Sequence, residues 1–356
     1  MLAFWRRGQL VLENYATRTS VAADPAAAEV LGYCDSWRSM NQILARLDRF
    51  DRASARALVD DLVAHTFLVA SDAPADAREA AMAAWTPWNP AAGFFHFSTK
   101  DVRYRSNPAE SDRRSRAKAR ISPPPAPTKR YPRLPAVALP APRPDGELVS
   151  VLHRRRTWRE FSQTPVTIAD LATLVGLTWG VQRHATIPGQ GPVVFKTSPS
   201  GGSRHPIEAY VMALRVRGLR RGLYHYDADR HRLARLSSTA TPRLAERFLG
   251  GQSWFRGAAA IVFMTAVFSR EQWRYSTPRA YRAVLLDAGH LCQTFCLLAT
   301  WLDLAPFCTM ALDDSAIESA IGIDGISESV LYAAGVGMKR PGAMSGSWPA
   351  VFRSGV

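Results

Sequence analysis

The sequence predicts an α+β protein in which a mixed sheet is flanked by helices and preceded by a smaller N-terminal domain. Two observations carry this prediction. After residue 145, apolar runs with helical spacing are intermixed with short apolar runs typical of strands. A basic, proline-rich stretch separates them from an N-terminal region with its own helical pattern. At 356 residues the chain is long enough for two domains.

The first 80 residues follow the plan of a winged helix. Residues 9–14 have the pattern of a short strand, and residues 25–45 and 51–65 have apolar side chains at helical spacing. Residues 66–69 are expected to close the domain as a strand. Residues 1–80 are therefore predicted to form a winged-helix-like domain. The groove of such a domain binds either DNA or peptide, and the fold does not decide which.

Residues 81–144 are predicted to connect the two domains. The aromatic side chains between Trp85 and Tyr104 are too dense for a free linker, so we expect them to dock on a domain. From Lys100 to Pro144 the chain has 12 Lys and Arg, 3 Asp and Glu, and 10 of the 24 prolines. This composition is typical of an exposed linker and supplies most of the net charge of +15. No zinc finger or other nucleic-acid-binding signature accompanies it, so we do not expect nucleic-acid binding.

The elements of the third region, residues 145–356, can be placed in order. Thr167 is expected to cap a helix over 168–176, with Asp170 in its first turn. The run 258–267 is continuously apolar, as in a strand covered on both faces. The other expected elements are helices over 148–156 and 280–302 and strands over 207–214, 222–227, 231–236 and 329–337.

Several classes of protein are disfavoured by absent signals. The chain has no GxGxxG after a strand, no GxxxxGK[ST], no GxSxG, no HExxH and no CxxC. No run of ~18 apolar residues predicts a membrane span. The start lacks the pattern of a signal peptide, and four cysteines are few, so a cytoplasmic location is expected. Cys292 and Cys296 share a helix face and are interpreted as small buried apolar residues, not metal ligands.

Three segments have side chains or backbone suited to a phosphate-bearing ligand. Residues 154–159 carry four arginines and a threonine, and residues 335–341 place Lys339 and Arg340 after a buried strand. Residues 197–206 form a Ser/Gly-rich loop whose backbone can approach a flat or anionic group. Each could instead be ordinary: a solvated helix end, a strand exit and a turn. Together they suit a mononucleotide such as FMN.

The order of these motifs resembles the nitroreductase-like flavoenzyme superfamily, and within it the SagB-type dehydrogenases. These are FMN-dependent azoline oxidases of ribosomal peptide natural-product clusters. The resemblance covers about residues 148–341, and the N-terminal region resembles the peptide-clasp region of such enzymes. It rests on Arg155-Arg156-Thr157-Trp158-Arg159, Ser198-Pro199-Ser200-Gly201-Gly202, Gly222-Leu223-Tyr224-His225-Tyr226, Tyr281-Arg282, Leu286-Asp287-Ala288-Gly289-His290 and Gly335-Val336-Gly337.

The resemblance implies a nitroreductase-like fold, an FMN cofactor and a homodimer in which the helix over 280–302 lies at the subunit interface. It also implies roles for individual residues. The FMN phosphate and ribityl chain would be held by Arg155, Arg156, Thr157, Arg159, Lys339 and Arg340. The ring and ribityl region would be lined by Pro199, Ser200, Gly201 and Gly202. Backbone N–H groups near the flavin would come from Met310, Ala311 and Leu312.

One position departs from the family pattern. The resemblance implies a Lys-Tyr pair that removes a proton, and this chain has Arg274-Tyr275 there. Arginine stays protonated in proteins and is a poor general base. Arg274 could orient a carbonyl or carboxylate, act electrostatically on Tyr275, or form only a surface ion pair. We take this pair as the candidate catalytic residues.

The expected function is two-electron oxidation of a heterocycle or residue in a ribosomal peptide natural product, together with biosynthetic partner enzymes. A second hypothesis is an NAD(P)H-dependent flavin reductase that acts on dehydroamino acids or on nitro or quinone compounds. A third is a non-catalytic peptide-binding scaffold.

Overall fold

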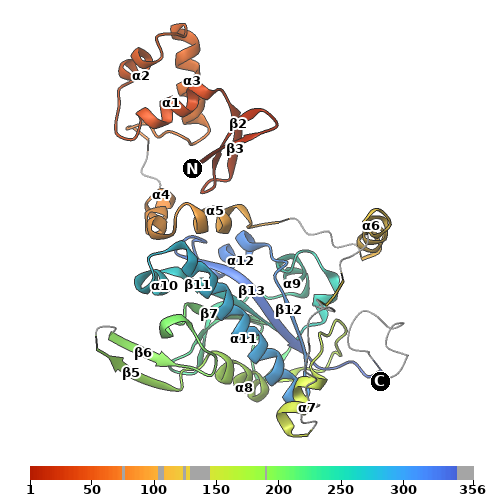
Figure 1. Cartoon of the computed structure of the whole chain (residues 1–356). Helices are drawn as coiled ribbons and strands as arrows, with labels where there is room; N and C mark the ends of the chain where they lie inside the picture. Colours follow the sequence, from red (N-terminus) through yellow and green to blue (C-terminus); the bar gives the residue numbers. More distant parts are fainter. Residues whose placement is uncertain (74–76, 103–107, 123–125, 129–144, 189–190, 343–356) are drawn as a thin grey trace, which may run out of the picture. The chain divides into compact units, whose positions relative to one another are not determined.

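A computed structural model describes residues 1–73, 77–102, 108–122, 126–128, 145–188 and 191–342 (Figure 1). The chain divides into two compact units. The first comprises Met1–Lys100 and Phe268–Ala283, and the second comprises Asp101–Val267 and Val284–Val356. The aromatic segment, which is expected in the connecting region, therefore belongs to the first unit.

The first unit begins with an antiparallel sheet in the order β1-β2-β3 and continues with three helices. Side chains cap all three helices: Asp24 accepts a hydrogen bond from the Ala26 amide, Asp51 accepts one from the Ser54 amide, and Ser39 forms a capping box. The bounds are β1 (Leu2–Arg6), β2 (Gln9–Asn14), β3 (Thr19–Ala23), α1 (Pro25–Tyr33), α2 (Met40–Arg46) and α3 (Arg52–Ala64).

The α+β class and the helical part of the N-terminal domain are confirmed, with two local corrections. The expected strand at residues 66–69 does not form. Phe67 instead packs its ring into the core of the helices, and Thr66 has a left-handed backbone with a φ of 62°. The expected helix over 25–45 is two helices, because the capping box at Ser39 begins α2 anew. The sheet of the first unit is formed by β1, β2 and β3, which all precede the helices in the sequence.

The aromatic segment docks as expected, and it does so within the first unit. Trp85 and Trp88 are almost completely buried. The Trp85 ring lies 4.7 Å, centroid to centroid, from the ring of Phe268, and the Trp88 Nε1 donates a hydrogen bond to the Tyr275 carbonyl at 2.9 Å. The elements are α4 (Ala77–Met82), η1 (Ala83–Trp88), α5 (Ala91–Ser98), α10 (Phe268–Arg274) and η4 (Pro278–Ala280).

The second unit is built on a six-stranded sheet in the order β10-β9-β7-β11-β13-β12. Every neighbouring pair in it is antiparallel, and a parallel pairing occurs between β4 and β8. The strands are β4 (Val166–Thr167), β5 (Arg183–Ile187), β6 (Gly191–Phe195), β7 (Ile207–Ala213), β8 (Val216–Arg217), β9 (Gly222–Asp227), β10 (Arg232–Ser237), β11 (Ala260–Val267), β12 (Ala305–Thr309) and β13 (Glu328–Gly337).

Helices cover both faces of this sheet (Figure 1). Ile261 and Phe263 of β11 pack in one core cluster with Phe248 of α9 and Ile317 of α12. The alternate residues of β11 are equally buried and face the other side, which confirms a strand covered on both faces. The helices are α6 (Pro108–Ile121), α7 (Glu147–Arg154), α8 (Ile168–Trp179), η2 (Gly201–Ser203), α9 (Pro242–Phe248), η3 (Ser253–Gly257), α12 (Asp314–Ile321) and α11 (Tyr281–Trp301), whose first three residues belong to the first unit.

The expected linker and the long apolar helix differ in part from what the sequence predicts. Part of the expected linker is the helix α6, while residues 103–107, 123–125 and 129–144 lie outside the described residues. By length and composition Pro278–Trp301 could cross a membrane, although no run of apolar residues indicated this. Half of its most apolar window is buried inside the protein, which is also the pattern of a core helix.

Candidate functional site

The Ser/Gly-rich loop lies between β6 and β7 and is bonded to helix α11. Ser198 is buried, and its hydroxyl lies 2.8 Å from the Thr294 hydroxyl of α11. The Ser200 hydroxyl accepts a hydrogen bond from the His205 amide at 2.8 Å. Gly202 has a φ of 55°, a conformation that favours glycine. Pro199 is exposed, and Ser200, Gly201 and Gly202 are half-buried. The loop is therefore held from one side and open on the other.

Asp287 of α11 is the main partner of this loop. Its side chain accepts hydrogen bonds from the Ser200 hydroxyl and the Gly201 amide, and only 4% of the residue is exposed. Burial raises the pKa of this carboxyl above its ordinary value, although the two hydrogen bonds act in the opposite direction. In the sequence, Asp287 is part of the motif 286–290 and has no predicted role. The signal that could have found it is a lone acid within a long apolar helix.

The first basic segment, residues 154–159, begins at the end of α7. Arg155 caps that helix, and Thr157 is half-buried. Arg156 bends back, so that its Nη1 donates hydrogen bonds to the carbonyls of His153 at 2.6 Å and Arg155 at 2.8 Å. The guanidinium of Arg159 lies 5.2 Å from the ring centroid of Trp254. Arg156 and Arg159 thus have partners within the chain itself.

The second basic segment, residues 338–341, lies directly beside the first. The Ser162 amide donates a hydrogen bond to the Met338 carbonyl at 2.9 Å, and the Arg340 Nη1 contacts Glu160 Oε2 at 3.2 Å. A Cβ at Gly337 would lie 2.6 Å from the Phe161 ring, so glycine permits this approach. The fold therefore brings together two cationic segments that are 180 residues apart.

Each cation of the second basic segment has a carboxylate partner. Lys339 forms an ion pair with Asp303, and its Nζ lies 5.7 Å from the ring centroid of Trp158. Arg340 forms the ion pair with Glu160 described above, and both of these side chains are largely exposed. An incoming anion would compete with these carboxylates for the same cations.

The resemblance implies that the backbone N–H groups of residues 310–312 face a flavin, but one of the three already has a partner within the chain. Met310 is 72% exposed, whereas the Leu312 side chain is buried in the core. The Ala311 amide donates a hydrogen bond to the Thr309 hydroxyl at 3.1 Å. The predicted contact of this segment with a flavin stays a prediction, and the Ala311 amide would have to exchange its partner to make it.

Arg274 and Tyr275 lie at and just after the end of α10, in the first unit, whereas all the predicted cofactor residues belong to the second unit. The Arg274 guanidinium lies 5.9 Å from the Tyr275 ring centroid. Both residues are exposed, and the backbone carbonyl of Tyr275 accepts the hydrogen bond from Trp88. Their catalytic role stays a prediction.

Three cysteines form a group that sequence reasoning missed. The Sγ atoms of Cys292 and Cys296 on α11 and of Cys308 on β12 lie within 4.8 Å of one another; we call this group the thiol cluster. Hydrogen bonds from the Cys292 and Cys296 thiols lower the pKa of the Cys308 thiol. The sequence paired Cys292 with Cys296 by helical spacing, but it carried no local signal that Cys308 would face them.

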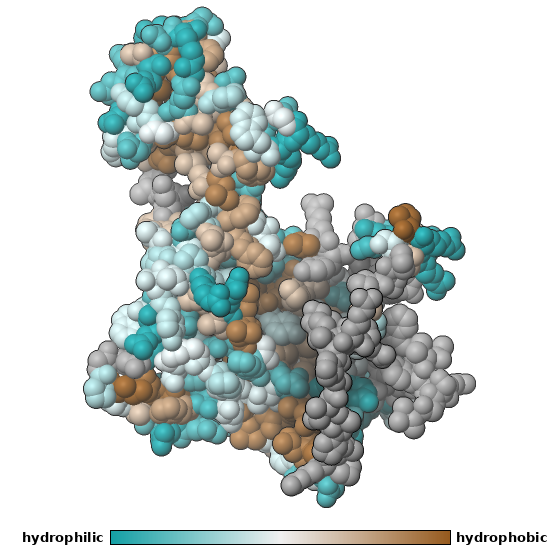
Figure 2. All heavy atoms as spheres, in the orientation of Figure 1, coloured by the Kyte–Doolittle hydropathy of each residue, from teal (hydrophilic) through white to brown (hydrophobic). Residues whose placement is uncertain are grey.

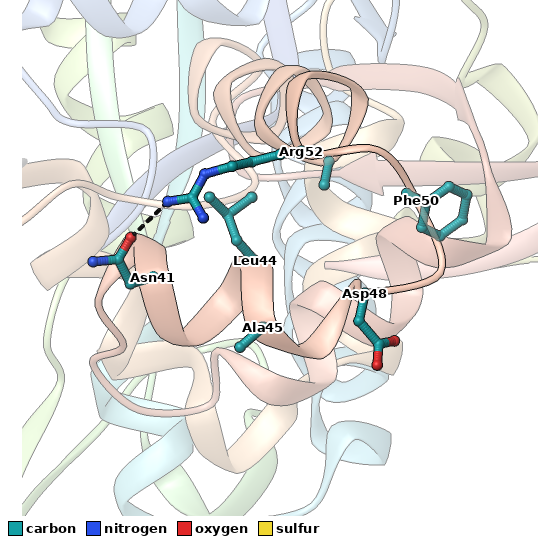
Figure 3. Close-up of a pocket in the computed structure, with 7 residues that line it drawn as sticks. Asn41, Leu44, Ala45, Asp48, Phe50 and Arg52 are labelled. Atoms are coloured by element: carbon teal, nitrogen blue, oxygen red, sulfur yellow. Dashed lines mark hydrogen bonds between the residues drawn. The ribbon is translucent and has the colours of Figure 1, made fainter.

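Two surface pockets lie away from these residues. In the first unit, a pocket of about 380 Å³ lies between α2 and the start of α3 (Figure 3), and in it the Arg52 guanidinium donates a hydrogen bond to Asn41 at 3.1 Å. In the second unit, a pocket of about 620 Å³ is lined by residues of α9, α12 and the β9–β10 edge. Arg247 and Asp313 form an ion pair at its wall, at 3.5 Å.

Comparison with known proteins places the similarity mostly in the second unit, together with the segment Phe268–Ala283 of the first. A sequence profile of the nitroreductase family matches residues 152–338. MJ1384 of Methanocaldococcus jannaschii, which carries the name of a nitroreductase, is 31% identical over 178 residues, or 50% of this chain and 85% of MJ1384. The trifolitoxin-processing protein TfxB of Rhizobium leguminosarum bv. trifolii is 34% identical over 46% of this chain, and TfxF is 31% identical over 40%. The chain spans 45% of the length of TfxB and 47% of that of TfxF.

Two solved structures show weaker similarity over the backbone. A nitroreductase structure from Anabaena variabilis matches with a TM-score of 0.47 and 27% identity, over 55% of this chain and 38% of the other. The Escherichia coli microcin synthetase McbBCD complex with truncated pro-MccB17 matches with a TM-score of 0.46 and 17% identity, over 89% of this chain and 98% of the matched chain. The sequence matches fit the resemblance to SagB-type enzymes that the motifs indicated.

Proposed function

The chain belongs to the nitroreductase family of oxidoreductases, and from that premise we propose that it binds FMN in its second unit. The supporting observation is the pairing of the two basic segments. Four groups capable of binding phosphate (Arg156, Arg159, Lys339 and Arg340) lie on adjoining stretches of backbone, although they are far apart in sequence. Such donors match the chemistry of a phosphate ester.

The chain's own residues would bind and orient the cofactor. Lys339 and Arg340 would exchange their carboxylate partners for phosphate oxygens, with Arg155, Arg156, Thr157 and Arg159 completing the phosphate site. The loop from Pro199 to Gly202 would lie along the ribityl chain and ring, because it has little side-chain bulk and is open on one side. Residues 310–312 would bring backbone groups to the ring. When bound, FMN would supply the two-electron redox chemistry.

A cofactor assay tests this proposal directly. Purified protein should be yellow, and the released chromophore should be FMN. Lys339→Ala and Arg340→Ala should weaken FMN binding by about tenfold or more, since each ~1.4 kcal/mol lost is tenfold in Kd. Arg243→Ala, which removes an exposed cation of α9, should leave binding unchanged. A colourless protein that cannot be reconstituted with FMN would refute the proposal.

For the reaction, we propose oxidation of a heterocycle or residue in a ribosomal peptide. The similarity to TfxB and TfxF, two proteins named for processing of the peptide trifolitoxin, favours this substrate class. Arg274 would orient a carbonyl or carboxylate of the substrate beside Tyr275, and residues 1–80 would bind the peptide. Partner enzymes of the same biosynthesis would supply the substrate.

The similarity to MJ1384 favours a second candidate, an NAD(P)H-dependent flavin reductase. The direction of electron flow distinguishes the two. Loss of flavin colour on addition of NADPH alone would support the reductase, and turnover of a leader-bearing peptide with re-oxidation by oxygen would support the oxidase. Deletion of residues 1–80 should abolish peptide binding but keep FMN binding. An unchanged peptide affinity would contradict the binding role of that domain and would leave the cofactor proposal intact.

We further propose that the protein is a cytoplasmic homodimer in which α11 packs against a second copy. Leu285, Leu286 and Trp301 of α11 are 40%, 61% and 45% exposed, and Figure 2 shows apolar residues on the surface of the second unit. Exposed apolar side chains along one helix suit an interface. Light scattering should give the mass of a dimer, Leu286→Glu should give a monomer, and Leu236→Glu, a control on the edge strand β10 with 46% exposure, should remain dimeric. A monomeric wild type would refute the dimer.

A further inference from the structure

The thiol cluster is a group of potential ligands that the proposed flavin chemistry does not use. Cys292 and Cys296 lie one turn apart on one face of α11, and both are buried. After α11 the chain turns at Asp303, whose φ is 58°, and returns as β12 with Cys308 facing the helix. The cluster therefore joins a central helix to the edge strand of the six-stranded sheet.

The geometry suits a zinc ion. Zinc binds cysteine sulfur at ~2.3 Å in a tetrahedral arrangement, which places neighbouring sulfur atoms ~3.8 Å apart. The three Sγ atoms already lie within 4.8 Å of one another, so small rotations of the side chains would reach that spacing. Three sulfur ligands from two elements of the fold leave one coordination position open.

The surroundings also suit a charged site. Three thiolates and one Zn²⁺ carry a net charge of −1, which is costly to bury without a nearby cation. The Arg155 guanidinium acts electrostatically on Cys296 and Cys308, and the Tyr332 hydroxyl hydrogen-bonds with Cys308. Such outer partners orient metal ligands and balance their charge.

We propose that Cys292, Cys296 and Cys308 bind one zinc ion, with the fourth position open to water or another small ligand. The ion links α11 to β12 and so stabilises the folded second unit. The proposal does not depend on FMN binding. A disulfide is the competing use of these sulfur atoms, but it would join two of them and leave the third unpaired.

Cobalt substitution of the full-length protein tests the site. Reduced, chelator-treated protein is titrated with Co²⁺ and observed for thiolate-to-cobalt charge-transfer absorption. We expect one Co²⁺ per chain, displaced by Zn²⁺. Cys308→Ser and Cys292→Ser should lose the absorption, whereas Cys34→Ser, which removes the one cysteine outside the cluster, should bind like the wild type. Absence of the absorption in the wild type, or its persistence in Cys308→Ser, would overturn the proposal.

A measurement on the unmodified chain guards against variants that fail to fold. Alkylation of each cysteine is followed by mass spectrometry with and without Zn²⁺. We expect Zn²⁺ to slow alkylation of the three cluster cysteines and to leave Cys34 unaffected, and to raise the melting temperature. An unchanged alkylation pattern, or a disulfide within the cluster that survives mild reduction of the folded protein, would overturn the proposal.

Discussion

Asp287 offers the sharpest test of how the loop at residues 198–206 is built. Asp287→Ala removes the acceptor for two hydrogen bonds, one from the Ser200 hydroxyl and one from the Gly201 amide. A hydrogen bond to a charged group contributes ~1.5–3 kcal/mol and a neutral one ~0.5–1.5 kcal/mol. Allowing for water to replace part of the loss at these half-buried donors, we expect the loop conformation to lose ~2 kcal/mol. If that conformation binds FMN, the Kd should rise by roughly 10- to 100-fold.

Two variants separate the hydrogen bonds from the charge. Asp287→Asn keeps an acceptor oxygen and the side-chain volume, so its FMN affinity should stay within about tenfold of the wild type. Ser200→Ala removes the hydroxyl that links the His205 amide to Asp287, and we expect an effect between those of the two Asp287 variants.

The assay is quenching of FMN fluorescence, with circular dichroism to confirm that each variant is folded. Burial raises the pKa of Asp287, so this group favours the folded state fully below its unfolded pKa and loses that contribution as pH rises through the raised value. Asp287→Asn should lack this pH dependence. A folded Asp287→Ala that binds FMN within twofold of the wild type would refute the reasoning.

Further predictions concern stability. Gly335→Ala would place a Cβ 2.3 Å from a buried phenylalanine ring of β12, so the unfolding free energy should fall by ~1–3 kcal/mol or more. Gly32→Ala, at an exposed position of α1 with open space around it, should instead gain up to ~1 kcal/mol. Equal losses of unfolding free energy for the two variants in urea denaturation would contradict the packing argument. A hydrogen bond to Glu208 raises the pKa of His225. The stability that the protonated His225 contributes is therefore complete below pH about 6.5 and is lost as the pH rises through the raised pKa. His225→Gln should flatten the pH dependence of the urea midpoint in that range, and an unchanged slope would count against this interpretation. Trp85→Ala should cost ~3–5 kcal/mol in the transition of the first unit, monitored by near-ultraviolet circular dichroism, and a loss below 1 kcal/mol would show that the aromatic segment is not core.

Local signals predicted much of the second unit. The strand over 222–227 and the cap at Thr167 agree with the structure because turn residues and hydrogen-bonding side chains act over a few positions. The strand predicted at residues 66–69 was wrong, because a short apolar run fits a turn that faces the core as well as it fits a strand. In the structure, Phe67 packs in the core and the segment forms a turn.

In the candidate site, too, some residues could be predicted from the sequence and others could not. Its basic segments and Ser/Gly loop could be identified from residue types, because cations and glycines have recognisable chemistry. The partners of these residues could not be identified. Asp287, Glu160 and Cys308 acquire their roles only when helix, loop and strand meet, and no spacing along the chain specifies those contacts.

The docking of Trp85 on Phe268 has a consequence for anyone who exchanges N-terminal domains between related proteins. Residues 83–98 precede the family domain in sequence, yet they pack against a segment that lies within it. A chimera that imports a foreign N-terminus up to residue 100 would expose that aromatic surface. The three-stranded sheet also contacts this segment, because the Tyr15 ring, just after β2, stacks on the Phe97 ring with 6.3 Å between centroids. A junction placed ahead of the tryptophans would keep the packing of Trp85 on Phe268, provided that the imported domain carries an aromatic side chain in the place of Tyr15.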